Sequence, residues 1–65
     1  MDQDLTAREI EILKWTSVGK TSSEVSMILR ISTNTVNFHI KNAIIKLKAV
    51  NKTAAVVLAL NRGKI

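Results

Sequence analysis

Cysteine and proline are both absent from this 65-residue sequence, and it contains only one tryptophan, one phenylalanine and one histidine. Without cysteine there is neither a disulfide nor a thiolate metal site, and a single histidine does not make a metal site. The absence of proline and of low-complexity runs, together with an apolar content of 46%, argues against disorder. We therefore expect one folded domain with no metal and no cofactor.

Long apolar runs are also absent. None approaches the roughly 20 residues that would span a bilayer, and the first residues, MDQDLT, are acidic and polar, unlike a signal peptide. These features predict a cytoplasmic protein with no membrane contact. A basic helix lying on a membrane surface is excluded because the basic residues do not line one broad face opposite an apolar one.

Catalytic patterns are missing as well. The sequence offers no Cys/His or Ser/His pairing and no glycine-rich phosphate loop. Glu9, Glu11 and Glu24 are explained by helix starts. We do not expect an enzyme.

The charges are divided along the chain. All five acidic residues lie in the first 24 positions, where three bases against five acids give −2. From Val25 onward there are seven basic residues and no acidic one, which gives +7 and a total of +5. A one-sided basic half favours a polyanionic partner. The alternative is an ordinary set of solubilising lysines.

The apolar residues follow a helical period throughout, which predicts an all-α, four-helix bundle over residues 5–65 after a disordered end at 1–4. The first helix follows a capping box at Thr6 and Glu9 and runs to about Val18. The others are expected from Thr21 to about Leu29, over about 33–48 and over about 52–61. The residues expected to face inward from the first two helices are Ile12, Leu13, Thr16, Ser17, Val25, Ile28 and Leu29.

The segment from Ser22 to Lys41 has the spacing of a helix-turn-helix. Ser26 is the small residue that lets the second helix of the motif cross closely, and Ile31 fills the turn. Arg30 stands where many such motifs have glycine, and a positive φ is uncommon for other residues. The third helix has an inner stripe formed by Val36, Ile40, Ala43, Ile44 and Leu47.

The opposite face of the third helix carries residues that can read bases. Asn34 and Asn37 can pair with adenine and Lys41 with guanine, while Phe38 can meet a thymine methyl. Phe38 could equally pack partly against the first helix. His39 is interpreted as a structural residue at the edge of the stripe. Phosphate contacts are expected from Lys20, Thr21, Thr33, Thr35 and Lys46.

The fourth helix, KTAAVVLALN, is apolar almost all round. Ala55, Val56 and Ala59 are expected to pack on the core. A second apolar face is then left outward, and exposed apolar patches mark interaction sites. We expect self-association into a homodimer through Ala54, Val57, Leu58 and Asn61. The alternative is contact with another domain.

Several motifs together resemble the LuxR-type helix-turn-helix domain. They are LTxRExxIL at 5–13, Trp15, GKTxxEV at 19–25, ISxxTVxxH at 31–39, Lys46-Leu47, and the late Ala55-Val56, Ala59 and Gly63. The sequences TVNFHxKN and NKT are most similar to the quorum-sensing branch of that family. The resemblance covers about residues 5–65.

The resemblance implies a DNA-binding output domain of a bacterial transcription regulator, associated with the nucleoid. It implies that the third helix enters the major groove, with Asn37, Phe38 and Lys41 reading bases, and that the fourth helix forms the dimer contact. An N-terminal sensor domain would lie outside this chain, which should therefore bind no acyl-homoserine lactone. RNA polymerase is a candidate partner. A helical protein-interaction module using the fourth helix is the alternative function.

Overall fold

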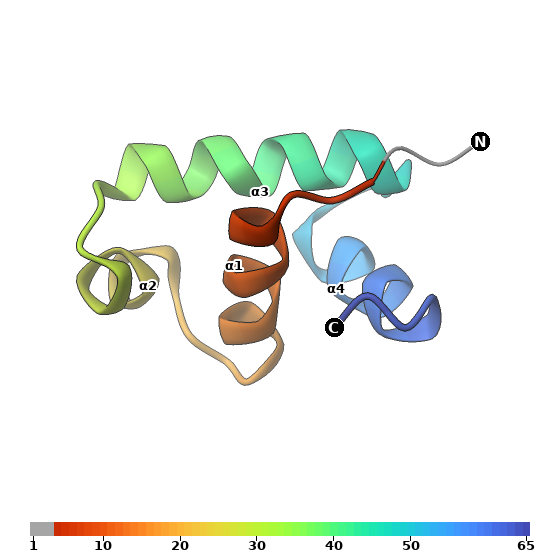
Figure 1. Cartoon of the computed structure of the whole chain (residues 1–65), viewed down its shortest axis with the longest axis horizontal. Helices are drawn as coiled ribbons and strands as arrows, with labels where there is room; N and C mark the ends of the chain where they lie inside the picture. Colours follow the sequence, from red (N-terminus) through yellow and green to blue (C-terminus); the bar gives the residue numbers. More distant parts are fainter. Residues whose placement is uncertain (1–3) are drawn as a thin grey trace.

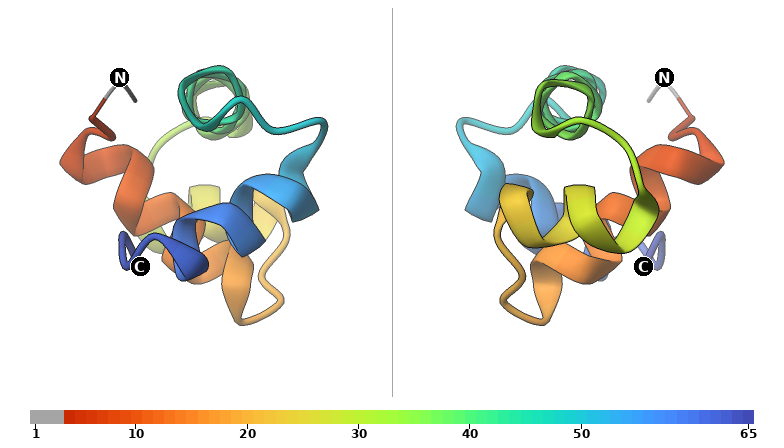
Figure 2. Two further views of the ribbon diagram at one scale, coloured as in Figure 1. Left: turned by 90° about the vertical axis from the view of Figure 1, so that its right-hand side faces the viewer. Right: turned by 90° about the vertical axis from the view of Figure 1, so that its left-hand side faces the viewer.

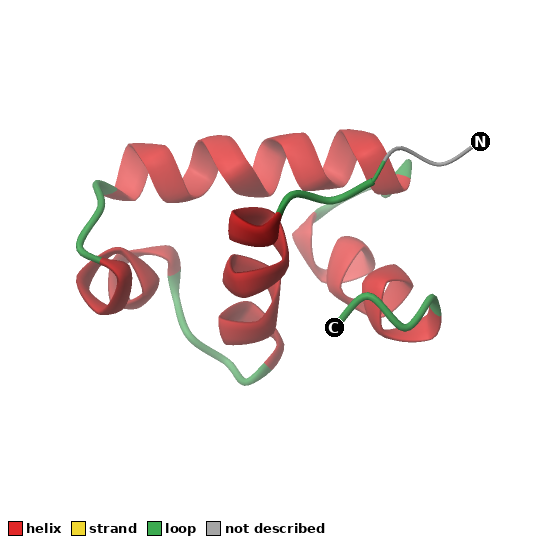
Figure 3. Ribbon diagram, in the orientation of Figure 1, coloured by secondary structure: helices red, strands yellow, loops and turns green. Residues whose placement is uncertain are grey.

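Each of the four helices begins directly after a side chain that caps it. In the computed structural model, which describes residues 4–65, the caps are Thr6, Thr21, Ser32 and Asn51, and each accepts a hydrogen bond from a backbone N–H three residues later. Such a bond satisfies one of the donors left free at a helix start. The helices are α1 (Ala7–Ser17), α2 (Ser22–Leu29), α3 (Thr33–Leu47) and α4 (Lys52–Asn61) (Figures 1 and 3).

The two predicted capping boxes are confirmed. Thr6 Oγ1 accepts from the Glu9 N–H at 3.1 Å, and Glu9 Oε1 accepts from the Thr6 N–H at 2.9 Å. Thr21 and Glu24 repeat this exchange at the same distances. The backbone N–H of Thr21, which donates to the Glu24 carboxylate, holds the pKa of Glu24 below its usual value.

The helices also end near the predicted positions. α1 ends at Ser17, and Gly19 follows with φ +92°, a conformation that glycine adopts at little cost. α2 and α3 end differently, because Arg30 and Lys48 take the left-handed conformation there with φ of 58° and 55°. The sequence indicated only that a positive φ is uncommon for a residue other than glycine, and Arg30 nevertheless adopts the left-handed conformation.

α3 lies across the end of α1, with α2 beneath its N-terminal end and α4 beneath its C-terminal end (Figures 1 and 2). At about 1.5 Å per residue its 15 residues span about 22 Å, most of the 32 Å long axis of the molecule. The other three helices thus form a base under one long helix. The far side of α3 faces no other helix.

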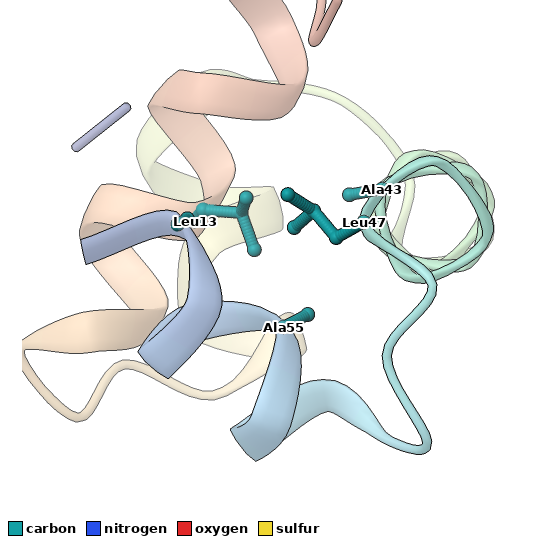
Figure 4. Packing of buried hydrophobic residues seen from close by; sticks show 5 residues of the cluster. Leu13, Ala43, Leu47 and Ala55 are labelled. Atoms are coloured by element: carbon teal, nitrogen blue, oxygen red, sulfur yellow. The ribbon is translucent and has the colours of Figure 1, made fainter. Parts of the chain in front are cut away.

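Two apolar clusters join this base to α3. Leu13, Ala43, Leu47, Ala55 and Ala59 form the first, where α1, α3 and α4 meet (Figure 4). Ile12, Val25, Val36 and Ile40 form the second, where α1, α2 and α3 meet. Adjacent residues of α1, Ile12 and Leu13, therefore enter different clusters, and Ile44 packs against both. The predicted inner stripe of α3 is confirmed.

Two inward predictions and one outward prediction need correction. Ser17 is exposed because it lies at the last position of α1, where its hydroxyl donates to the Lys14 carbonyl. Ile28 is 42% exposed, since Val25 and Leu29 take the positions of α2 that face the second cluster. Leu58, expected to point outward, packs partly against the first cluster. The predicted disordered end, apart from the exposed Asp4, falls outside the described residues.

A buried ion pair ties α1 to α3. Lys46 Nζ lies 2.9 Å from Glu9 Oε1 and 3.2 Å from Glu9 Oε2. The Glu9 side chain is 3% exposed and that of Lys46 20%. Burial acts to raise the pKa of Glu9, but the bonds from the Thr6 N–H and from Lys46 outweigh it, so this pKa lies below its usual value. The pair fixes the C-terminal half of α3 over the start of α1.

Glu9→Gln should destabilise the fold by about 1–3 kcal/mol at neutral pH, because glutamine keeps the capping bond but leaves Lys46 without a counter-charge. A carboxylate with a lowered pKa stabilises the fold above its ordinary pKa and loses that contribution as pH falls through the folded value. The deficit of the variant should therefore shrink below a pH of about 4.5. Urea unfolding of both proteins at several pH values between neutral and acidic measures this difference in the free energy of unfolding.

Glu11→Gln is the matched control. Glu11 pairs with Arg8 at 3.1 Å, but both side chains are more than 40% exposed, so this variant should change stability by less than about 0.5 kcal/mol. Equal stability of the two variants at every pH would show that the Glu9–Lys46 pair contributes nothing.

Candidate nucleic-acid interface

The crossing of α2 and α3 depends on Ser26. This residue is only 9% exposed, and its hydroxyl donates to the Ser23 carbonyl at 2.6 Å. It also accepts from Thr33 Oγ1 at 3.2 Å, which links the middle of α2 to the first residue of α3. A larger side chain at position 26 would push the helices apart. Ser26 therefore acts as the small residue that the sequence predicted.

The turn between the helices is fixed by backbone hydrogen bonds. With Arg30 in the left-handed conformation, the Ile31 N–H donates to the Ser26 carbonyl at 3.1 Å, a standard way to end a helix. Ile31 packs against the second cluster and fills the angle, as predicted. Ser32 then accepts from the Thr35 N–H at 3.0 Å and starts α3.

The outer face of α3 presents all four predicted base-reading side chains. Asn34, Asn37, Phe38 and Lys41 are exposed. They lie opposite the buried stripe of Val36, Ile40, Ala43 and Leu47. Phe38 is 59% exposed, which decides against its packing in the core. This face combines amide, ammonium and aromatic groups on one rigid helix.

His39 lies beside Phe38 and is half-buried. The two rings meet edge to face, with their centroids 5.7 Å apart and their planes at 70°. That geometry is favourable for aromatic pairs. The contact orients Phe38, which fits the structural role expected of His39.

The predicted phosphate-contacting residues lie in three places. Lys20 and Thr21 stand at the start of α2, Thr33 and Thr35 at the start of α3, and Lys46 near its end. The threonine hydroxyls already form local bonds, including one of 2.8 Å between Ser32 and Thr35. Lys46 is the exception to the expected arrangement, because Glu9 holds its ammonium group.

Sequence reasoning missed the partner of Lys46. Glu9 had a complete local explanation as a capping residue, and no periodic pattern connects positions 37 apart. The only available signal was the position of Glu9 itself. It precedes Ile12 and Leu13 by three and four residues, on the buried side of α1.

The outward side of α4 is apolar but smaller than predicted. Val57 is 48% exposed and Asn61 is exposed, whereas Ala54 and Leu58 are half-buried. Leu60, which the sequence interpretation did not include, is 50% exposed. No helix of residues 4–65 has the length and apolar character needed to cross a membrane. The same residues contain no cluster of His, Asp or Glu that could hold a metal ion.

Comparison with known proteins agrees with this geometry. Residues 3–59 match the family described as "Bacterial regulatory proteins, luxR family". The transcriptional activator protein SolR of Ralstonia nicotianae is 57% identical over 61 residues, which are 94% of this chain and 26% of SolR. The regulatory protein SdiA of Escherichia coli is 52% identical over 64 residues, 98% of this chain and 27% of SdiA. The chain thus spans about a quarter of the length of these relatives.

Solved structures show the same fold. The transcription factor GerE has a TM-score of 0.89 at 33% identity, with 95% of this chain and 94% of that chain covered. Vibrio cholera VqmA, in a complex with ligand and DNA, has a TM-score of 0.86 at 33% identity and covers 97% of this chain, which corresponds to 28% of VqmA.

The predicted all-α fold is confirmed by the likeness to GerE. The prediction that the chain is not an enzyme is confirmed because the family consists of transcription regulators. The resemblance to the quorum-sensing branch is also confirmed. The quorum-sensing regulator RhlR of Pseudomonas aeruginosa is 52% identical to this chain, over 94% of this chain and 25% of RhlR. The chain belongs to the LuxR family of bacterial regulatory proteins and is a DNA-binding helix-turn-helix domain of that family.

Proposed function

We propose that this domain binds double-stranded DNA sequence-specifically, with α3 in the major groove, as the output module of a transcription regulator. The observation that carries the proposal is the outer face of α3. Four exposed side chains with base-reading chemistry stand there, while the opposite face is buried against three other helices. An α-helix about 10–12 Å across fits a major groove about 12 Å wide.

Each of the four side chains has a matching base edge. The amides of Asn34 and Asn37 can donate to N7 and accept from N6 of adenine, and Lys41 can donate to O6 and N7 of guanine. Phe38 offers an apolar edge to a thymine methyl, and its ring meets that of His39 edge to face. The resemblance to the family implies that Asn37, Phe38 and Lys41 are the main base-reading residues, and Asn34 lies nearer the helix start.

Phosphate contacts would orient α3 without reading sequence. Lys20 and Thr21 at the start of α2, and Thr33 and Thr35 at the start of α3, are placed for this role. Backbone N–H groups at these helix starts add donors. Lys46 would have to share its ammonium group with Glu9, so we expect its phosphate contact to be the weakest of the set.

A second copy of the chain would complete the binding unit. Helix-turn-helix proteins commonly bind two-fold symmetric sites as dimers. Ala54, Val57, Leu58 and Asn61 are proposed to form the homodimer contact, and the exposed Leu60 extends that surface. Because so little apolar surface is exposed there, we expect the isolated domain to dimerise weakly until DNA holds two copies together.

This domain would form part of a longer regulator, with a sensor domain on the N-terminal side of the DNA-binding domain. The relatives named above are about four times longer than the matched segment, and one is titled a quorum-sensing regulator. Ligand sensing and contact with RNA polymerase would therefore belong to the whole regulator. The domain described here would bind DNA and no acyl-homoserine lactone.

Titration of the domain against a labelled mixed-sequence duplex at several salt concentrations tests DNA binding directly. The logarithm of the binding constant should fall linearly with the logarithm of salt, at a slope of about −0.9 per phosphate contacted. Fluorescence anisotropy measures it. Absence of binding even at about 50 mM salt, for a covalently linked dimer as well as for the single chain, would refute the proposal.

Lys41→Ala tests the reading of bases. On a preferred site selected from a randomised duplex pool, the variant should lose about 1–3 kcal/mol of binding free energy and discriminate less at one base pair. Competition binding against single-base variants of that site measures both effects. Lys14→Ala, which removes an exposed lysine from the last turn of α1, is the control and should bind like the wild type.

Val57→Asn tests the dimer contact. The change replaces an exposed apolar side chain and should reduce cooperative binding to a two-half-site duplex, while binding to one half-site stays unchanged. Gel-shift titrations on the two duplexes separate these effects. Val50→Asn is the control because Val50 is 88% exposed but lies outside the helices. Equal cooperativity in both variants would contradict the assignment to α4.

A further inference from the structure

Two residues other than glycine adopt the left-handed conformation in the described chain, and both are basic. They are Arg30, with φ 58°, and Lys48, with φ 55°. Arg30 ends α2 two residues before the cap of α3, and Lys48 ends α3 itself. The two turns therefore lie at opposite ends of α3 (Figure 1). Both side chains are exposed, and neither takes part in the two ion pairs found among residues 4–65.

The backbone hydrogen bonds of the two turns do not require a long basic side chain at either position. In each turn the backbone N–H groups close the helix. Those of Arg30 and Ile31 donate to the Ser26 carbonyl, and those of Lys48 and Ala49 donate to Ile45 and Ile44 at 3.1 and 3.0 Å. Glycine or asparagine would make the same bonds without the steric cost that other residues bear at positive φ. Residues in strained backbone conformations cluster at functional sites.

The length of α3 suggests what that function is. A straight helix of about 22 Å cannot follow a curved groove about 12 Å wide over its whole length, so its ends approach the two rows of phosphates. Cations at the ends of the helix are then in reach of phosphate oxygens. Of the lysines on α3 itself, Lys41 stands on the base-reading face and Lys46 is held by Glu9.

We propose that Arg30 and Lys48 are the phosphate anchors of α3, one at each end, and that they hold the helix in register along the groove. The proposal rests on the DNA-binding function proposed above and assigns it two contacts. The guanidinium of Arg30 can bond two phosphate oxygens at once, whereas Lys48 supplies a point charge on a flexible stem. A purely local role is the competing explanation, since cations also stabilise helix C-termini.

Arg30→Gly and Lys48→Gly separate the two explanations. Both changes remove one positive charge and relieve the left-handed strain. If each residue contacts a phosphate, each variant should lower the magnitude of the salt slope by about 0.9 per bound chain. Each phosphate contact multiplies the binding constant by the salt concentration raised to the power of about −0.9, which is about 8 at about 100 mM salt. Each variant should therefore also bind the mixed-sequence duplex about 8-fold more weakly at that salt concentration. Fluorescence anisotropy at several salt concentrations measures both quantities.

Lys64→Gly is the matched control. It makes the same change of charge at an exposed residue of the C-terminal segment, which lies away from α3 (Figures 1 and 2). It should leave the salt slope unchanged. Arg30→Lys should keep the slope within about 0.2 of the wild type, because it keeps the charge. Circular dichroism melting checks that every variant is folded, and asparagine variants, which tolerate positive φ, replace any glycine variant that is not.

The outcomes are distinguishable. Lower slopes in the Arg30 and Lys48 variants, with an unchanged slope for Lys64→Gly, support the proposal. Wild-type slopes in both variants, with wild-type DNA binding intact, overturn it and leave the helix-end explanation. Equal losses in all three glycine variants also overturn it, because net charge would then explain them. If the wild type itself binds no duplex, the proposed function fails, and the anchors fail with it.

Discussion

The position of α3 depends on the burial of one stripe of its side chains. Val36, Ala43 and Leu47 are at most 2% exposed, and they meet side chains from all three other helices. A domain of this size has a small core, so nearly all of it is used to hold this one helix. The opposite face can then remain polar and open without loss of packing. Stability and the proposed recognition thus occupy opposite sides of α3.

The local features could be predicted from sequence because their causes are local. A capping box such as Thr6 with Glu9 brings together residues three apart, and the stripe on α3 follows from the helical period. The left-handed conformation of Arg30 is an exception, because the spacing of the motif predicts a turn there but not that a residue other than glycine adopts a positive φ. Side-chain chemistry likewise identified Asn37 and Lys41 as base-reading candidates, and the structure exposes both.

The features that sequence could not give depend on packing between helices. The Glu9–Lys46 pair joins two helices whose relative rotation no periodic pattern records. Ile28 and Leu58 were misassigned for the same reason. α2 and α4 are short and apolar on more than one side, so the choice of the buried face is made by the neighbouring helix. The pair also changes the interpretation of Lys46, from a free cation to one that α1 holds in place.

The start of α3 lacks the acidic residue that the starts of α1 and α2 carry. α1 and α2 carry a glutamate at the third position, which completes a capping box and complements the positive end of the helix dipole. α3 and α4 have no acid in their first turns. In α3 the third position is Thr35, whose hydroxyl bonds Ser32. A glutamate there would stabilise the helix start but place a negative charge beside the phosphates that this end is proposed to approach. α3 thus lacks the glutamate of the capping box that stabilises the starts of α1 and α2. No side chain of its first turn neutralises the positive end of its helix dipole, which stays available for the proposed phosphate contacts.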